Sequence, residues 1–259
     1  MAEDQIDLQP SARRTALGRI GSLGIVSLFG CGGDSASTSA TSTSTGSGST
    51  TGTGSTSSAG SCTIIPQETE GPYPLLAILS NASIVRRDIT EGKPGLPLTL
   101  TITLENTNAD CAPIVGAAIY IWHCDKDGEY SGYSSSQNGN HAGETYLRGI
   151  QVSDANGQVS FTTIYPGWYA GRITHIHMQV YLNDKLTVTA TATTQFAFPQ
   201  DATTAVYNSS LYVGHGQNTS VTSFAADNVF SDGTTYQMLS LTGDAANGYA
   251  ATIKVGIAA

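Results

Sequence analysis

The sequence predicts an all-β fold, with an antiparallel β-sandwich core and long active-site loops. Residues 96–105 (LPLTLTITLE) alternate between apolar side chains and threonine, which is typical of a strand with one buried face. Further short apolar segments are separated by Asn, Asp, Gly and Pro turns over most of the chain. No segment keeps the period of about 3.6 residues that an amphipathic helix requires. These observations favour a β-sandwich.

The predicted strands follow one another in chain order. Residues 114–123 are apolar on both faces, which predicts a strand in the middle of a packed sheet. Residues 154–157 (DANG) predict a hairpin turn that joins the strands on either side of it. Residues 134–143, rich in Ser, Asn and Gly, predict a mobile loop that can carry function. We expect strands at 96–105, 114–123, 146–152, 158–164, 174–182, 185–198 and 248–257.

The first part of the chain predicts export. Arg13 and Arg14 precede a short apolar run that ends just before Cys31, as in a bacterial lipobox, and the paired arginines partly resemble a twin-arginine signal. An ordinary secretory signal is the alternative. Residues 32–61 are almost only Ser, Thr, Gly and Ala, which predicts a flexible linker. We therefore expect an export signal at 1–31, a linker at 32–61 and one folded domain at 62–259, in a cell-envelope lipoprotein or a secreted protein.

Charge and cysteine content narrow the partners and the compartment. With 11 Lys and Arg against 20 Asp and Glu, the net charge is -9, which argues against nucleic acid and anionic membrane surfaces as partners. Membrane contact is expected only through an N-terminal lipid anchor. In an oxidising compartment, Cys62, Cys111 and Cys124 predict one disulfide and one free thiol. Because an extended run holds Cys111 and Cys124 apart, Cys62 should pair with one of them.

Residues 157–181 carry the pattern that indicates a metal site. His175 and His177 are two apart in a β-branched run, so in a strand both imidazoles point to the same face. Two half-buried histidines of a sheet are the structural alternative. Tyr130 follows an Asp-Gly turn and Tyr169 follows a Pro-Gly turn. Because a phenol keeps its proton to about pH 10, two tyrosine ligands favour Fe(III) over zinc.

These motifs resemble the intradiol ring-cleavage dioxygenases, which include protocatechuate 3,4-dioxygenase and catechol 1,2-dioxygenase. The resemblance covers residues 63–198 and is carried by ETEGPY, VGAAIYIWHCDKDGEY, LRGIQ and YPGWYAGRITHIH. It implies a non-haem Fe(III) cofactor, with catechol-type compounds and O2 as substrates. The residues that it implies are Tyr130, Tyr169, His175 and His177 as metal ligands, Arg172 beside the substrate, and Gln195 behind the ligands.

The implied reaction opens the aromatic ring between its two hydroxyl-bearing carbons and gives a muconate-type diacid. Fe(III), two phenolates and one hydroxide sum to zero charge, which a buried site holds at low cost. We therefore hypothesise that hydroxide and Tyr169 leave the metal when the substrate binds and that each takes one of its two protons, so the site stays neutral. Arg172 then stabilises the anionic ring. Strand parity would put Arg172 on the face opposite His175, so a turn or bulge is expected between them.

Other interpretations of the same residues stay open. The chain could be a catalytically inactive secreted β-sandwich binding module, or a zinc hydrolase that uses the two histidines and leaves both tyrosines unexplained. The sequence does not distinguish a plain or alkylated catechol from a carboxylated one, and it leaves open whether the protein forms a homo-oligomer. Residues that compete for the site by composition, and for which we expect other roles, are Tyr133, Tyr165, His123, His141 and His215.

Overall fold

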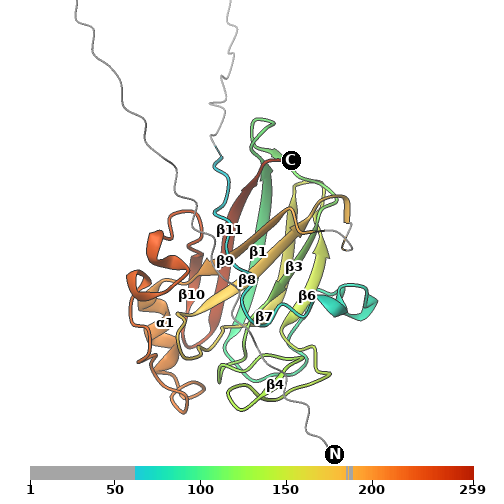
Figure 1. Cartoon of the computed structure of the whole chain (residues 1–259). Coiled ribbons are helices and arrows are strands. Elements are labelled where there is room, and N and C mark those ends of the chain that lie inside the picture. Colours follow the sequence, from blue (N-terminus) through green and yellow to red (C-terminus); the bar gives the residue numbers. More distant parts are fainter. Residues whose placement is uncertain (1–61, 185, 187–188) are drawn as a thin grey trace, which may run out of the picture. The chain divides into compact units, whose positions relative to one another are not determined.

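The computed structural model of the protein describes residues 62–184, 186 and 189–259 (Figure 1). The predicted export signal, Cys31 and the linker lie outside the described residues, so they stay predictions. Within the described part of the chain, none of the helices has the length and the apolar character needed to cross a membrane.

Two sheets form the body of the domain (Figure 1). Sheet A contains β10 (Ser240–Asp244), β11 (Gly248–Ile257), β1 (Pro97–Asn106), β2 (Ala112–Pro113) and β7 (Gln158–Ile164), with β2 and β7 both paired to β1. Sheet B has the order β6 (Arg148–Val152), β3 (Ala118–Trp122), β8 (His175–Tyr181) and β9 (Ala192–Ala197), and all its pairs are antiparallel.

Shorter elements connect the strands. Strands β4 (Ser134–Ser135) and β5 (Gly139–Asn140) form a small separate hairpin within the loop that follows β3. The α-helix α1 (Gln200–Tyr207) follows β9. The 3-10 helices are η1 (Leu76–Ile78), η2 (Ala82–Ile84), η3 (Leu182–Asp184), η4 (Phe224–Ala226) and η5 (Phe230–Asp232).

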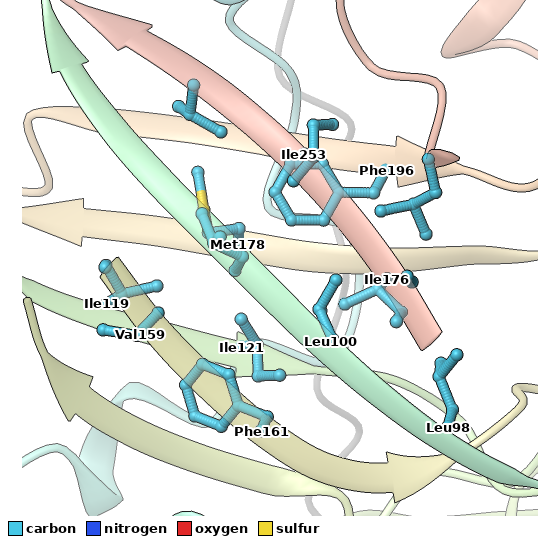
Figure 2. Close-up of a cluster of buried hydrophobic side chains, with 14 of the residues drawn as sticks. Leu98, Leu100, Ile119, Ile121, Val159, Phe161, Ile176, Met178, Phe196 and Ile253 are labelled. Atoms are coloured by element: carbon cyan, nitrogen blue, oxygen red, sulfur yellow. The ribbon is translucent and has the colours of Figure 1, made fainter. Parts of the chain in front are cut away.

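The core lies between the two sheets. Alternation along β1 buries its leucines and isoleucine, with Leu100 and Ile102 fully inaccessible, while the threonines face outward. Figure 2 shows side chains from both sheets gathered in one cluster, in which Leu98, Leu100, Val159, Phe161 and Ile253 come from sheet A and Ile119, Ile121, Ile176, Met178 and Phe196 from sheet B. One face of each sheet is therefore committed to the core, which leaves the other face for function.

The all-β prediction is confirmed, and several strands occur where the sequence places them. Strands β7 and β11 have the predicted bounds, and β1 is displaced by one residue. Strand β3 is buried at every position, as expected for a central strand. It begins at Ala118, later than predicted, after a turn at Gly116 with φ 74°.

The predicted hairpin around residues 154–157 is wrong. The turn itself forms, since Gly157 N donates to Asp154 O at 2.9 Å, but it connects two sheets. Strand β6 pairs with β3 in sheet B, whereas β7 pairs with β1 in sheet A. The Asp154 side chain accepts from the Gln158 backbone at 2.9 Å, so this turn is stable without pairing of its flanking strands.

Three further details differ from the prediction. Strand β1 pairs with β11 in parallel, so the sandwich is not antiparallel throughout. The strand expected at 185–198 is limited to β9. Helix α1 was not predicted, because its sequence QDATTAVY lacks a helical period and the N-cap residue before it, Pro199, makes no side-chain cap. Tertiary contacts hold it, since the Tyr207 hydroxyl donates to Pro166 O at 3.1 Å.

The cysteines follow the predicted pattern of one disulfide and one free thiol. Cys62 pairs with Cys111, with their Cα atoms 5.6 Å apart, and ties the start of the domain to the turn after β1. Of the alternatives left open, Cys124 is the buried free thiol. Burial raises the pKa of the Cys124 thiol, which makes it unreactive.

Candidate metal centre

One line of paired residues crosses all four strands of sheet B. Arg148 in β6 pairs with Trp122 in β3, Trp122 pairs with His177 in β8, and His177 pairs with Gln195 in β9. Paired residues point to the same face of a sheet, and here that face is the one away from the sandwich core. The row therefore places an arginine, an indole, an imidazole and an amide side by side on the outer face.

The predicted histidine pair projects from this face. His175 Nε2 and His177 Nε2 are 3.0 Å apart, and both side chains are buried. His175 Nδ1 lies 2.6 Å from Ile173 O. Because a carbonyl only accepts, Nδ1 carries the proton and Nε2 presents a lone pair.

The His177 ring is held on one face and at one edge. Its ring stacks on Trp122 with the centroids 4.8 Å apart and an angle of 2° between the planes. Gly71 lies against its edge, where a Cβ atom would be 2.9 Å from His177 Cε1. The ring has little freedom to rotate, which is a property expected of a metal ligand.

Tyr130 reaches the histidines from the loop after β3. It is fully buried, and its hydroxyl lies 3.5 Å from His175 Nε2. The Asn138 side chain accepts from Tyr130 N at 2.7 Å and donates to Tyr130 O at 2.8 Å, so it fixes the backbone on both sides. The Tyr130 ring stacks on Tyr73, with the centroids 4.6 Å apart.

Tyr169 lies in the loop before β8 and is only partly buried. Its ring centroid is 5.6 Å from that of His175 and 5.7 Å from that of Tyr130. The structure thus brings Tyr130, Tyr169, His175 and His177 together from two loops and one strand. Their role as metal ligands remains a prediction.

Arg172 extends over the same group. Strand β8 begins at His175, so the turn required by strand parity does occur before it. Arg172 Nη1 is 3.5 Å from His175 Nε2, and Nη2 donates to Gln195 Oε1 at 2.7 Å. Gln195 in turn donates to Thr69 O at 2.9 Å. The two residues predicted to lie behind and beside the ligands are therefore in contact with each other.

Burial keeps the four candidate ligands uncharged. Burial, followed by the charge of Arg172, lowers the pKa of His175 to about 3. Burial, followed by the neighbouring His175, brings the pKa of His177 well below its usual range. Burial raises the pKa of Tyr130 well above its usual range and that of Tyr169 to about 12, although Arg172 partly offsets the effect at Tyr169. At pH 7 the imidazoles are neutral and can donate lone pairs.

This donor set fits Fe(III). Two nitrogen ligands about 2.1 Å from one ion and roughly at right angles are about 3 Å apart, which matches the 3.0 Å between the two Nε2 atoms. The phenols give up their protons near neutral pH only to a strongly Lewis-acidic ion. Another group of potential ligands, Cys62, Glu105 and Cys111, includes both disulfide sulfurs and is not a metal site.

The competing tyrosines and histidines have other partners. The Tyr133 ring lies at 70° to that of Tyr73, with the centroids 5.1 Å apart. The contacts are Tyr133 with Leu75 N, Tyr165 with Thr203, His123 with Cys124 O and Thr163, His141 with Glu129 and Glu144, and His215 with Trp168 O. None of these contacts involves the group of four candidate ligands.

The sequence prediction missed residues that shape the site. Tyr73, in the ETEGPY motif, stacks on Tyr130, and Arg148, in LRGIQ, donates to Tyr73 O at 2.8 Å. Both motifs were recognised without a role for these side chains. Asp227, whose carboxylate accepts from Arg172 Nε at 2.9 Å, had no signal at all because it lies 55 residues away along the chain.

Comparison with known proteins identifies the family. The family model for "Dioxygenase" (Dioxygenase_C) matches residues 70–212, which is more than half of the chain. The intradiol ring-cleavage dioxygenase from Tetranychus urticae is similar in structure, with a TM-score of 0.65 and 26% identity over 76% of this chain and 95% of that chain. Dioxygenase Tetur07g02040 is also similar in structure, with a TM-score of 0.62 and 27% identity over 76% of this chain and 94% of that chain.

A more distant structure has the same fold. The dioxygenase domain of a dioxygenase carbohydrate-binding protein fusion from Streptomyces sp. SirexAA-E gives a TM-score of 0.51 and 22% identity, over 75% of this chain and 98% of that chain. The matched range contains Tyr130, Tyr169, His175 and His177, which converge on the outer face of sheet B. The chain belongs to the intradiol ring-cleavage dioxygenase family.

Proposed function

We propose that this protein is an active intradiol dioxygenase. It would use a non-haem Fe(III) ion and O2 to open a catechol-type ring between its two hydroxyl-bearing carbons, giving a muconate-type diacid. The observation that carries the proposal is the convergence of two phenols and two neutral imidazoles, with Tyr130 Oη and His177 Nε2 at 3.5 and 3.0 Å from His175 Nε2. A binding module that had lost the chemistry would have no reason to keep this set buried and aligned.

The candidate ligands differ in burial, and we assign them different roles accordingly. A ferric ion bound here would supply Lewis acidity, which stabilises phenolate and catecholate charge and makes the bound ring reactive toward O2. Tyr130 and His177 are fully inaccessible and His175 nearly so, and all three stay fixed. Tyr169 is partly exposed, and its pKa of about 12 keeps its phenol protonated at pH 7. A Tyr169 phenolate that is released from the metal would therefore take a proton from a substrate hydroxyl and keep it on Oη.

Arg172 supplies the positive charge of the site. Its guanidinium is buried, and Nη1 lies 3.5 Å from His175 Nε2. A fixed cation in a poorly solvated site stabilises negative charge that develops on a ring carbon. This is the role that we assign to Arg172.

The substrate is proposed to be a plain or alkylated catechol. Both arginines of the site already have partners: Arg148 donates to Tyr73 O and Ser131 O, and Arg172 donates to Asp227 and Gln195. All three nitrogens of Arg148 have partners, and the remaining Nη1 of Arg172 is directed at His175, so we assign neither arginine to a carboxylate on the substrate ring. We expect kcat/KM for catechol to exceed that for protocatechuate, and the opposite order would contradict this assignment.

The test of the proposed function combines metal analysis, absorption spectroscopy and oxygen uptake. Purified protein should contain about one iron per chain, show a broad visible band from phenolate-to-iron charge transfer, and consume O2 with catechol. Tyr130→Phe should lose the band and turnover, because it removes a fixed phenolate. Tyr133→Phe, a nearby tyrosine outside the donor set, is the matched control and should keep both. An iron-loaded protein without the band would rule out the proposal.

We also propose that the protein works outside the cytoplasm. The sequence of residues 1–61 supports this, and so does the Cys62–Cys111 disulfide, because such bonds persist mainly in oxidising compartments. Cell fractionation and mass spectrometry of the mature N-terminus would decide between a lipid-anchored Cys31 and a secreted chain.

A further inference from the structure

We propose that Asp227 is a positioning residue for Arg172, so that the segment from Asn218 to Phe230 belongs to the active site although it lies beyond the range matched by the family. This inference rests on the proposed function, because it explains how the positive charge of that site is oriented.

The segment holds three successive residues of the turn between Tyr169 and β8. Gly171 N donates to Ser220 Oγ at 3.1 Å, and Arg172 O accepts from Asn218 Nδ2 at 2.8 Å. Ile173 N donates to Asp227 Oδ2 at 2.8 Å. Three successive backbone groups are thus fixed from outside the turn, by residues on the far side of helix α1 in the sequence.

Asp227 is itself firmly fixed. Its side chain is fully buried, and Oδ1 accepts from Val229 N at 2.9 Å and from Phe230 N at 3.1 Å. The other oxygen accepts from Arg172 Nε at 2.9 Å as well as from the Ile173 amide. Every bond of this carboxylate is therefore used to orient either its own loop or the turn that carries Arg172.

The pairing determines which edge of the guanidinium meets the ligands. An arginine has five donors in a rigid plane. Nε is occupied by Asp227 and Nη2 by Gln195, which leaves Nη1 toward His175 Nε2 at 3.5 Å. Rotation of Arg172 would leave a buried, unpaired carboxylate, and such a state is strongly disfavoured. Asp227 therefore keeps the cation aimed at the ligands.

The experiment compares Asp227→Asn with Asp232→Asn in the iron-loaded full-length protein. Both changes remove one carboxylate charge, but Asp232 is exposed. We expect Asp227→Asn to lower kcat roughly 100-fold, as for a lost transition-state charge, with iron content, resting visible band and KM nearly unchanged. The affinity for catechol measured without O2 should also stay within about threefold, since Arg172 acts after binding. Asp232→Asn should match the wild type.

A double-variant comparison shows whether Asp227 acts through Arg172. Adding Asp227→Asn to Arg172→Gln should not lower kcat further, and the melting temperature of the metal-free double variant should exceed that of Asp227→Asn alone, because no buried charge is left unpaired. Independent, multiplying effects on kcat would overturn the inference. So would Asp227→Asn with wild-type kcat, or with loss of iron, which would indicate general support of the ligands.

A second variant covers the case in which Asp227→Asn does not fold. Asn218→Ala removes the hydrogen bond to Arg172 O and the bonds that Asn218 Oδ1 accepts from Ser220 and Val221 within the same segment. It should lower kcat about fivefold with iron retained, because the turn that carries Arg172 loses part of its support. An unchanged kcat in a folded Asn218→Ala protein would count against the proposal that this segment positions the turn that carries Arg172. A wild-type protein that shows neither the visible phenolate-to-iron band nor oxygen uptake would instead refute the proposed function. Failure of the proposed function is therefore distinguishable from failure of the role assigned to Asp227.

Discussion

At the scale of single residues, the site depends on how closely backbone approaches His177. Gly71 has φ 70°, and a Cβ there would come within 2.9 Å of His177 Cε1. Only glycine meets both demands at no cost, because other residues rarely adopt a positive φ and their Cβ would displace the ring. With Trp122 stacked on the imidazole, the ring position is set by two neighbours that cannot themselves bind metal.

Gly71→Ala is expected to reduce iron affinity at least tenfold, because the added methyl group moves either His177 or the loop that carries Tyr73. Iron content after dialysis against a chelator measures this. Gly92→Ala is the matched control, since Gly92 has a similar φ of 75° but nothing within 4 Å of the added Cβ. Gly92→Ala should lower the free energy of unfolding by about 1 kcal/mol and leave the iron content unchanged. Equal iron content in both variants would show that the close approach does not matter.

At the scale of elements, the site is assembled by the register of the strands in sheet B and by loops that other elements support. The pairing of β6, β3, β8 and β9 aligns Arg148, Trp122, His177 and Gln195 in one row. Helix α1 supports the loop that carries Tyr169, since Tyr207 donates to Pro166 O and also bonds Thr174. Strand β8 carries both histidines, while Tyr169 sits in the loop before it and is only partly buried.

The end of β3 is also tied to the opposite sheet. His123 Nε2 lies 2.7 Å from Thr163 Oγ1 of β7, and Nδ1 lies 2.7 Å from Cys124 O. Because a carbonyl only accepts, His123 is a neutral imidazole that donates from Nδ1 and accepts at Nε2. Burial lowers the pKa of His123 to about 4. It is a structural link between sheets.

This link predicts a pH dependence of stability. Since the pKa of His123 is below its unfolded value, its contribution is complete above about pH 6.5 and is lost as the pH falls toward 4, where the unfolded chain takes up the proton first. Between pH 7 and 4 the wild type should lose about 3 kcal/mol more than His123→Gln. Urea unfolding of the metal-free proteins at both pH values measures the difference, and parallel losses would contradict it.

At the scale of the whole molecule, the described domain is closed by long-range connections. Strand β11, close to the C-terminus, pairs in parallel with β1, and Ile65 N donates to Gly256 O at 2.9 Å. The disulfide between Cys62 and Cys111 spans 49 residues and fixes the N-terminal end of the domain to the same region. The segment that carries Gly71 and Tyr73 lies within this closed loop.

Removal of the disulfide by the paired change of Cys62 and Cys111 to serine should lower the free energy of unfolding by about 4 kcal/mol, from the entropy of a loop of 49 residues. Iron binding in the folded variant should persist, because the candidate ligands lie on other elements. Chemical denaturation with and without the bond measures the loss. A variant that folds normally but fails to bind iron would show that the closed loop itself organises the site.

The sequence by itself determined the all-β class, strands β1, β7 and β11 almost to the residue, and the identity of Tyr130, Tyr169, His175 and His177 as candidate ligands. These follow from local patterns: alternation reports which face is buried, and spacing of two puts His175 and His177 on one face. Only the tertiary structure decided that β6 and β7 lie in different sheets, that Cys62 pairs with Cys111, and that Asp227 meets Arg172. The physical reason is that contacts between residues far apart in the sequence depend on complementary packing and burial in the folded protein. These leave no periodic pattern in the sequence.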